Sequence, residues 1–210
     1  MTYRCVAASV AGFVQQVAVG YIAHGYYFYV AGRIPNGKEP SKTDSKIIAQ
    51  YGIDVAKWTR SRRKRAGQAN VQYLRYDQFY VILATHGEHA FFVEEGDRIR
   101  DIRQHPLRFF DYSIGCRKSR RGGELHPSVR ISRKAFRQLK TRFEKSAVSS
   151  TSDELWQALR NMPFEPYAPV RDQFRILLRA VNRMRKTAGL ELVPWTACRL
   201  RRCPVKPFSG

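Results

Sequence analysis

The 210-residue sequence predicts an α+β fold: a mostly antiparallel sheet with an N-terminal helix and a helical, basic C-terminal third. Three observations carry this prediction. Residues 70–86 contain two apolar runs joined at Asp77-Gln78, residues 110–116 alternate between apolar and polar side chains, and residues 132–188 show helix caps and helical spacing. We therefore place the sheet between residues 21 and 131. The predicted domains are an α+β core at residues 1–146 and a helical appendage with an extended basic arm at residues 147–210.

The N-terminal stretch predicts a buried helix that leads into an aromatic strand. Val10, Phe13 and Val17 recur at helical spacing, and Gly20 can end the helix. The strand is expected over residues 21–31. Residues 5–32 carry no Asp, Glu, Lys or Arg, but the adjacent glutamines at 15 and 16 would be costly at the centre of a bilayer, so no membrane association is expected.

A strongly basic segment predicts a short helix between Asp54, a good N-cap, and Gly67, a good terminator. A preceding helix, capped at Thr43 or Asp44 and reaching residue 50, makes a helix-turn-helix an alternative. In that alternative Val55 and Trp58 pack inward. The charges surround the helix at nearly every position, which favours contact with phosphates over reading of bases.

The central part of the chain predicts the sheet in more detail. Residues 79–84 are apolar on both faces, as in a central strand, and residues 85–89 turn into an apolar run at 91–93 that we place in the sheet core. Residues 98–103 resemble an edge strand. Phe110, Tyr112, Ile114 and Cys116 are expected on one face of the next strand. The glycine-containing tip at residues 117–124 then leads to a returning strand at 129–131.

The C-terminal third predicts helices with basic faces. Ser132 is expected to cap one helix, and Thr151 with Glu154 to form a capping box for another. The longest helix is expected over residues 170–188. Its arginines recur every four residues beside an apolar face, and a proline-rich arm follows from residue 191.

The charge balance indicates a polyanionic partner. Lys and Arg number 38 against 17 Asp and Glu, which gives a formal net charge of +21 spread over the whole chain. Nucleic acid is the commonest partner for such a protein, and the predominance of Arg favours RNA slightly over DNA. We expect a subunit of a ribonucleoprotein or mobile-element complex, with other proteins of the same complex as further partners. A different alternative is that the chain is a basic structural protein that docks on an acidic protein partner. Scattered cysteines favour a reducing, cytoplasmic location.

The predicted nucleic-acid contacts come from four basic segments. They are Lys57, Arg60, Arg62, Arg63, Lys64 and Arg65; Arg117, Lys118, Arg120 and Arg121; Arg171, Arg175, Arg179 and Arg183; and Arg199, Arg201 and Arg202.

The turn at residues 86–89 supports an alternative function. His86, Glu88 and His89 are a dense titratable cluster, and two imidazoles with a carboxylate can hold a divalent metal that activates water. This alternative is a metal-dependent endonuclease or nickase. The main prediction is a non-catalytic protein without a cofactor. Cys198 and Cys203 lack a second pair at matching spacing, so no zinc site is expected.

Overall fold

The structure is a computed structural model, which describes residues 3–119 and 122–209. The chain divides into two compact units. Unit 1 comprises residues 1–107, 114–127 and 205–210, and unit 2 comprises residues 108–113 and 128–204. Antiparallel sheets and helices confirm the α+β class, and the last third is helical as predicted. The division into a core at residues 1–146 and an appendage at residues 147–210 stays a prediction.

The N-terminal helix continues beyond its predicted end. Helix α1 spans Val10–Gln15 and begins at Ser9, whose Oγ accepts a hydrogen bond from the Gly12 amide at 3.0 Å. A π-helical turn, η1 (Gln16–Tyr21), and a 3-10 turn, η2 (Ile22–His24), follow it. The prediction that Gly20 ends the helix is therefore wrong. The segment ends at Gly25, whose φ of 91° suits glycine.

Unit 1 contains a four-stranded sheet in the order β2-β3-β1-β4. Its strands are β1 (Phe28–Arg33), β2 (Val71–Tyr76), β3 (Phe79–Ala84) and β4 (Arg100–Asp101). The predicted hairpin, its turn, the central position of β3 and the edge position of β4 are confirmed. Asp77 lies in the hairpin turn at a φ of 53°. Strand β1 starts at Phe28 and not at residue 21, because the helical turns extend to His24.

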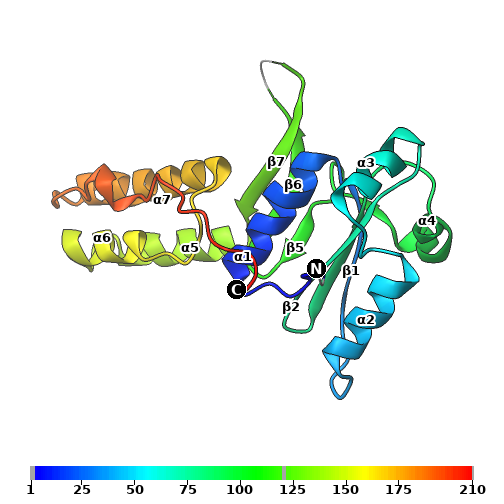
Figure 1. The fold of residues 1–210 in the computed structure, drawn as a ribbon. Helices are drawn as coiled ribbons and strands as arrows, with labels where there is room; N and C mark the ends of the chain where they lie inside the picture. The colour runs from blue at the N-terminus through cyan, green and yellow to red at the C-terminus, as the bar shows by residue number, and fades with distance from the viewer. Residues whose placement is uncertain (1–2, 120–121, 210) are drawn as a thin grey trace. The chain divides into compact units, whose positions relative to one another are not determined.

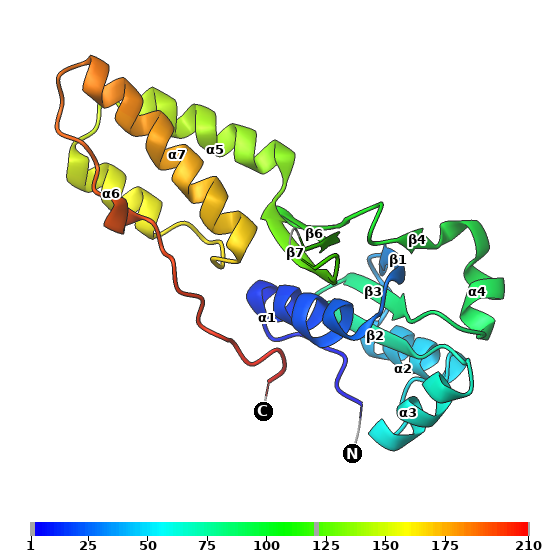
Figure 2. The same ribbon diagram turned by 90° about the horizontal axis from the view of Figure 1, so that it is seen from above.

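Helices cover both faces of this sheet (Figure 1, Figure 2). On one face, α2 (Pro40–Gln50) and α4 (Ala90–Glu95) contribute Ile47, Ile48 and Phe91 to a cluster with Tyr73 and Ile82. Helix α1 covers the other face. The prediction that residues 91–93 belong to the sheet core is wrong, since they lie in α4. Helix α2 begins at Pro40, before the predicted caps.

The residue predicted as a cap of α2 has a different role. Asp44 is buried and accepts a hydrogen bond from the Tyr73 hydroxyl at 2.6 Å. Its carboxylate also pairs with Arg75, whose Nε and Nη2 each lie 2.8 Å from a carboxylate oxygen. Burial, followed by the hydrogen bond to Asp44, raises the pKa of Tyr73. This triad fixes α2 on β2.

A second sheet has the order β5-β6-β7, with β5 (Leu107–Phe109), β6 (Tyr112–Lys118) and β7 (Leu125–Ile131). The alternation over residues 112–116 is confirmed, because Tyr112, Ile114 and Cys116 are buried. Phe110 does not belong to this face: it lies in the turn before β6 at a φ of 48° and is 62% exposed.

Unit 2 consists mainly of α5 (Arg133–Ser146), α6 (Ser152–Arg160) and α7 (Ala168–Thr187), and α5 and α7 run side by side (Figure 1, Figure 2). The Ser132 cap and the capping box are confirmed. Arg185 is buried and donates to the carbonyl oxygens of Ala147 at 2.8 Å, Ser150 at 2.7 Å and Glu191. Among the residues described, no helix has both the length and the apolar character needed to cross a membrane.

Candidate nucleic-acid interface

The basic segment forms helix α3 (Lys57–Arg65), and each of its residues is exposed or half-buried. Its N-cap is Ala56, so the prediction of an Asp54 cap is wrong. Trp58 is 64% exposed and lies under the guanidinium of Arg62, 4.9 Å from the ring centroid. The inward packing of Trp58 that the helix-turn-helix alternative required is therefore wrong. Helix α3 presents charge to solvent on most of its circumference.

One face of α3 forms a wall of an open hollow of about 440 Å³, which we call the α3 hollow. Lys57, Arg60 and Lys64 are one helical turn apart, so they share this face. The opposite wall comes from the helical segment at residues 16–24, with Gln16, Gly20, Tyr21 and His24. The floor comes from Asn70, Gln72 and Thr85, which lie in or next to strands β2 and β3. The hollow is lined by Gln16, Gly20, Tyr21, His24, Tyr26, Lys57, Arg60, Ser61, Lys64, Asn70, Gln72 and Thr85.

Hydrogen bonds hold the floor and α3 in register. The Asn70 amide donates to Thr85 Oγ1 at 2.9 Å, and the Thr85 amide donates to the Asn70 carbonyl at 2.9 Å. Asn70 Nδ2 donates to the carbonyl of Arg60 at 2.9 Å, and the Arg60 guanidinium donates to the carbonyl of Val55 at 2.6 Å. Burial raises the pKa of Tyr26, and the nearby Arg60 opposes that shift. The hollow is thus polar and preorganised.

A second open hollow of about 430 Å³, the aromatic hollow, shares His24, Lys64 and Thr85 with the first. Tyr27 and Phe28 line it, and the Arg103 guanidinium lies 5.0 Å and 5.6 Å from their ring centroids. Its complete lining is His24, Gly25, Tyr27, Phe28, Lys64, Thr85, His86 and Arg103.

A third hollow of about 580 Å³, the tip hollow, shares Arg103 with the aromatic hollow and contains Arg117 and Lys118. Among the described residues that line the three hollows, Asp101 is the only acid. It is already bonded to Arg103, at 2.6 Å from Nη2 and 2.9 Å from Nε. Burial alone would raise the pKa of Asp101, but the hydrogen bonds from Arg103 lower it overall. We call the three hollows together the unit 1 groove.

The unit 1 groove brings together five of the predicted contact residues, Lys57, Arg60, Lys64, Arg117 and Lys118. Arg62, Arg63 and Arg65 do not line it, and Arg63 donates to the Gly52 carbonyl at 3.3 Å. Arg120 and Arg121 lie outside the described residues. Sequence reasoning missed His24 and Arg103. A charge pattern gives no signal for either, because His24 is isolated in an uncharged segment and Arg103 is close to Asp101.

The predicted contacts in unit 2 divide into fixed and solvent-facing arginines. Arg171 donates to the carbonyl of Leu200 at 3.3 Å, Arg199 pairs with Glu165 at 3.4 Å, and Arg202 stacks on Tyr167 at 4.9 Å. These three therefore hold the C-terminal arm. Arg175 is exposed and pairs with Asp172 at 2.9 Å. Arg179, Arg183 and Arg201 are exposed.

The residues of the catalytic alternative face different neighbours. His89 caps α4, since its Nδ1 accepts a hydrogen bond from the Phe91 amide at 3.1 Å, and burial followed by the charge of Arg63 lowers its pKa. The His86 ring lies 6.5 Å from that of Phe28. Glu88 pairs through its backbone with residues 67 and 69. Within residues 3–119 and 122–209, no three His, Cys, Asp or Glu side chains form a group that could hold a metal.

Comparison of the chain with protein-family models, with curated proteins and with solved structures finds no match. The features of the chain that bear on its function are therefore the geometry and the charge of the unit 1 groove.

Proposed function

We propose that the protein binds single-stranded nucleic acid along the unit 1 groove, mainly through phosphates, with RNA favoured slightly over DNA. The observation that supports this most is the continuity of the groove: three adjacent hollows share lining residues and carry six cations with one acid, which is already paired. We further propose that it acts as a non-catalytic subunit of a ribonucleoprotein or mobile-element complex.

The form of the groove supports a single strand. Reading a duplex requires an element that protrudes into a groove of the nucleic acid, whereas a single strand fits a cationic channel with aromatic platforms. Here the cations occupy the walls, and Tyr27 and Phe28 supply the aromatic surface. Each hollow, at about 430 to 580 Å³, is comparable to a small-ligand site.

The polar floor supports the preference for RNA. Asn70, Gln72 and Thr85 line the bottom of the α3 hollow, and the buried Asn70 Oδ1 has no hydrogen-bond partner among the described residues. An amide oxygen can accept a hydrogen bond from the ribose 2′-hydroxyl, which DNA lacks. The Arg-rich composition adds guanidinium groups, which stack on bases and bind phosphates in a bidentate manner.

Fluorescence anisotropy with matched single-stranded and double-stranded RNA and DNA at several salt concentrations tests the proposal. We expect the single strands to bind more tightly than the duplexes, with RNA slightly ahead. The log of the association constant should fall with log salt by roughly 0.7 per phosphate contacted on a single strand. A salt-independent association constant would refute binding through phosphates.

The metal-dependent nuclease centred on His86, Glu88 and His89 remains the alternative. Incubating a labelled strand with Mg²⁺ or Mn²⁺ separates the two functions. Under the proposed function the strand stays intact. Cleavage by the parent protein that disappears in the His86→Ala, His89→Ala double variant would instead establish the nuclease.

A further inference from the structure

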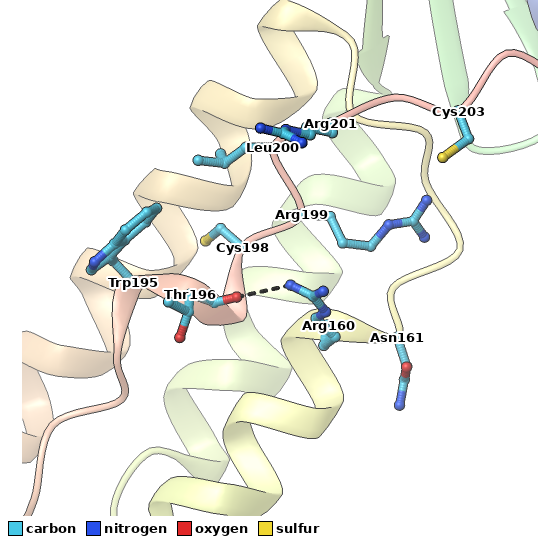
Figure 3. Close-up of a pocket in the computed structure, with 9 residues that line it drawn as sticks. All are labelled: Arg160, Asn161, Trp195, Thr196, Cys198, Arg199, Leu200, Arg201 and Cys203. Atoms are coloured by element: carbon cyan, nitrogen blue, oxygen red, sulfur yellow. Dashed lines mark hydrogen bonds between the residues drawn. The ribbon is translucent and has the colours of Figure 1, made fainter.

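Unit 2 contains a hollow of its own, of about 620 Å³, between the end of α6 and the C-terminal arm (Figure 3). The indole of Trp195 lies on one side and the guanidinium groups of Arg160 and Arg199 on the other, with Cys198 between them (Figure 3). The hollow is lined by Arg160, Asn161, Trp195, Thr196, Cys198, Arg199, Leu200, Arg201 and Cys203. None of these described lining residues is Asp or Glu.

The Trp195 side chain is held in solvent by a fixed backbone. It is 68% exposed, although it begins the 3-10 turn η4 (Trp195–Ala197), whose last residue is fully buried. On the N-terminal side of Trp195, the backbone of Val193 forms two hydrogen bonds with the side chain of Asn182. Asn182 Nδ2 donates to the Val193 carbonyl at 2.8 Å, and the Val193 amide donates to Asn182 Oδ1 at 2.9 Å. An indole that stays exposed on a rigid support loses little conformational entropy when a ligand stacks on it.

The three arginines of the hollow differ in their freedom. Arg160 donates to the Thr196 carbonyl at 3.1 Å and lies 5.5 Å from the Trp156 ring centroid, and Arg199 pairs with Glu165. Arg201 is exposed, and none of the described residues forms a hydrogen bond or ion pair with it. Arg201 is therefore the cation whose donors are available to an incoming anion.

We infer that this hollow binds an unpaired nucleotide, with the base stacked on Trp195 and the phosphate held by Arg201. Every nucleobase offers a flat π face to an indole, and a guanidinium binds phosphate through paired donors. A free phosphate has no flat face for the indole, and the carboxylates of an acidic peptide have none either, whereas a nucleotide carries the flat face and the anion in one unit. The choice of a nucleotide rests on the proposed function, but the site is built entirely within unit 2.

Tryptophan fluorescence of the full chain, titrated with AMP, tests this site directly. We expect AMP to quench part of the emission and Trp195→Phe to remove that part. Trp58→Phe is the matched control, because Trp58 is also exposed but lies on α3, and it should keep the quench. Arg201→Gln should weaken AMP binding several-fold while the quench at saturation stays the same. Equal quenching in the parent and in Trp195→Phe would overturn the inference.

Competitors separate the ligand classes. Inorganic phosphate should compete weakly and adenosine should bind more weakly than AMP, since each supplies half of the ligand. Poly-glutamate that displaces AMP more effectively than single-stranded RNA does would assign the hollow to an acidic protein and overturn the nucleotide assignment.

The affinity for single-stranded RNA gives an independent measurement. Trp195→Ala should reduce it by about 5-fold to 150-fold, the range that loss of one stacked base produces, and should leave duplex affinity unchanged. Unchanged single-strand affinity would count against the site. If RNA binds with a steep salt dependence but Trp195 is not quenched, this inference alone fails. If AMP quenches Trp195 but no polynucleotide binds, the proposed function fails and the nucleotide site stands.

Discussion

Removing two groove cations from α3 should weaken binding far more than removing two cations from the rest of the helix. The perturbation is Lys57→Gln with Lys64→Gln. Both residues line the α3 hollow, and Lys64 also lines the aromatic hollow. Arg60 is left in place because it supports the Val55 carbonyl. The matched control, Arg62→Gln with Arg65→Gln, removes the same charge from the same helix at positions outside the groove.

The magnitude follows from the number of groove cations that have no acidic partner. Arg103 is paired with Asp101, which leaves Lys57, Arg60, Lys64, Arg117 and Lys118. At about 0.7 per phosphate on a single strand, five contacts give a slope of log affinity against log salt of about −3.5. Losing two contacts reduces its magnitude by about 1.4. With equal affinities of parent and variant at about 1 M salt as the reference, this corresponds to about 25-fold weaker binding at about 0.1 M salt and about 70-fold at about 0.05 M.

Anisotropy titrations of a labelled single-stranded RNA over that salt range measure both quantities. The control variant should change the affinity by less than about threefold, because its charges act on the strand only through a screened field. The circular dichroism spectra of both variants should match that of the parent, which checks that they are folded. Equal losses in the two variants would refute the groove and favour non-specific attraction to α3 as a whole.

Three further predictions concern the groups that fix the fold. The pKa of His89 lies below its ordinary value of 6.5, so the stability that its neutral form provides should be lost as pH falls from about 6.5 through the folded-state pKa. Melting temperatures of His89→Asn, which can still cap α4, should lack that loss, and parallel pH profiles would contradict the assignment. Asp44→Asn should cost about 3 kcal/mol in urea unfolding, because it leaves Arg75 without its carboxylate, whereas the exposed Lys46→Gln on the same helix should cost little. Arg185→Gln should cost about 3 kcal/mol by leaving buried carbonyls unbonded, with Lys186→Gln as its control; a loss below 1 kcal/mol, on the order of one hydrogen bond, would contradict a supporting role.

Local chemistry made much of the fold predictable. The β2–β3 hairpin could be placed because residues 79–84 are apolar on both faces and Asp77 tolerates a left-handed turn. The caps at Ser132 and Thr151 could be placed because their hydrogen bonds involve residues only three positions away. Such features require no knowledge of the tertiary structure.

The errors arose where tertiary contacts or local caps outweighed an apolar pattern. The aromatic run at residues 91–93 looks like a strand, but His89 caps a helix there and Phe91 fills the core beneath α2. Trp58 looks like a core residue, but α3 is held by hydrogen bonds that involve Arg60, and the indole lies exposed with the Arg62 guanidinium over it.

The candidate groove was predictable only in part. The sequence identifies α3 and the tip as basic, but it cannot show which face of α3 is used, because cations surround the helix. Lys57, Arg60 and Lys64 become distinct only once the segment at residues 16–24 lies opposite them. The positions of His24 and Arg103 depend on the sheet, so no local pattern indicates them.

The junction between the two ends of unit 1 affects how the protein folds during synthesis. Gln15 in α1 exchanges two hydrogen bonds with the backbone of Val205, and the Ala8 amide donates to the carbonyl of Pro207 at 2.8 Å. Gln15 and Val205 are 190 residues apart in the sequence. At 5 to 20 residues per second, a ribosome needs roughly 10 to 40 s to make the intervening chain. During that time α1, and with it one wall of the α3 hollow, lacks its C-terminal strap. A nascent chain that has completed the β2–β3 hairpin therefore carries the basic helix before the opposite wall is secured.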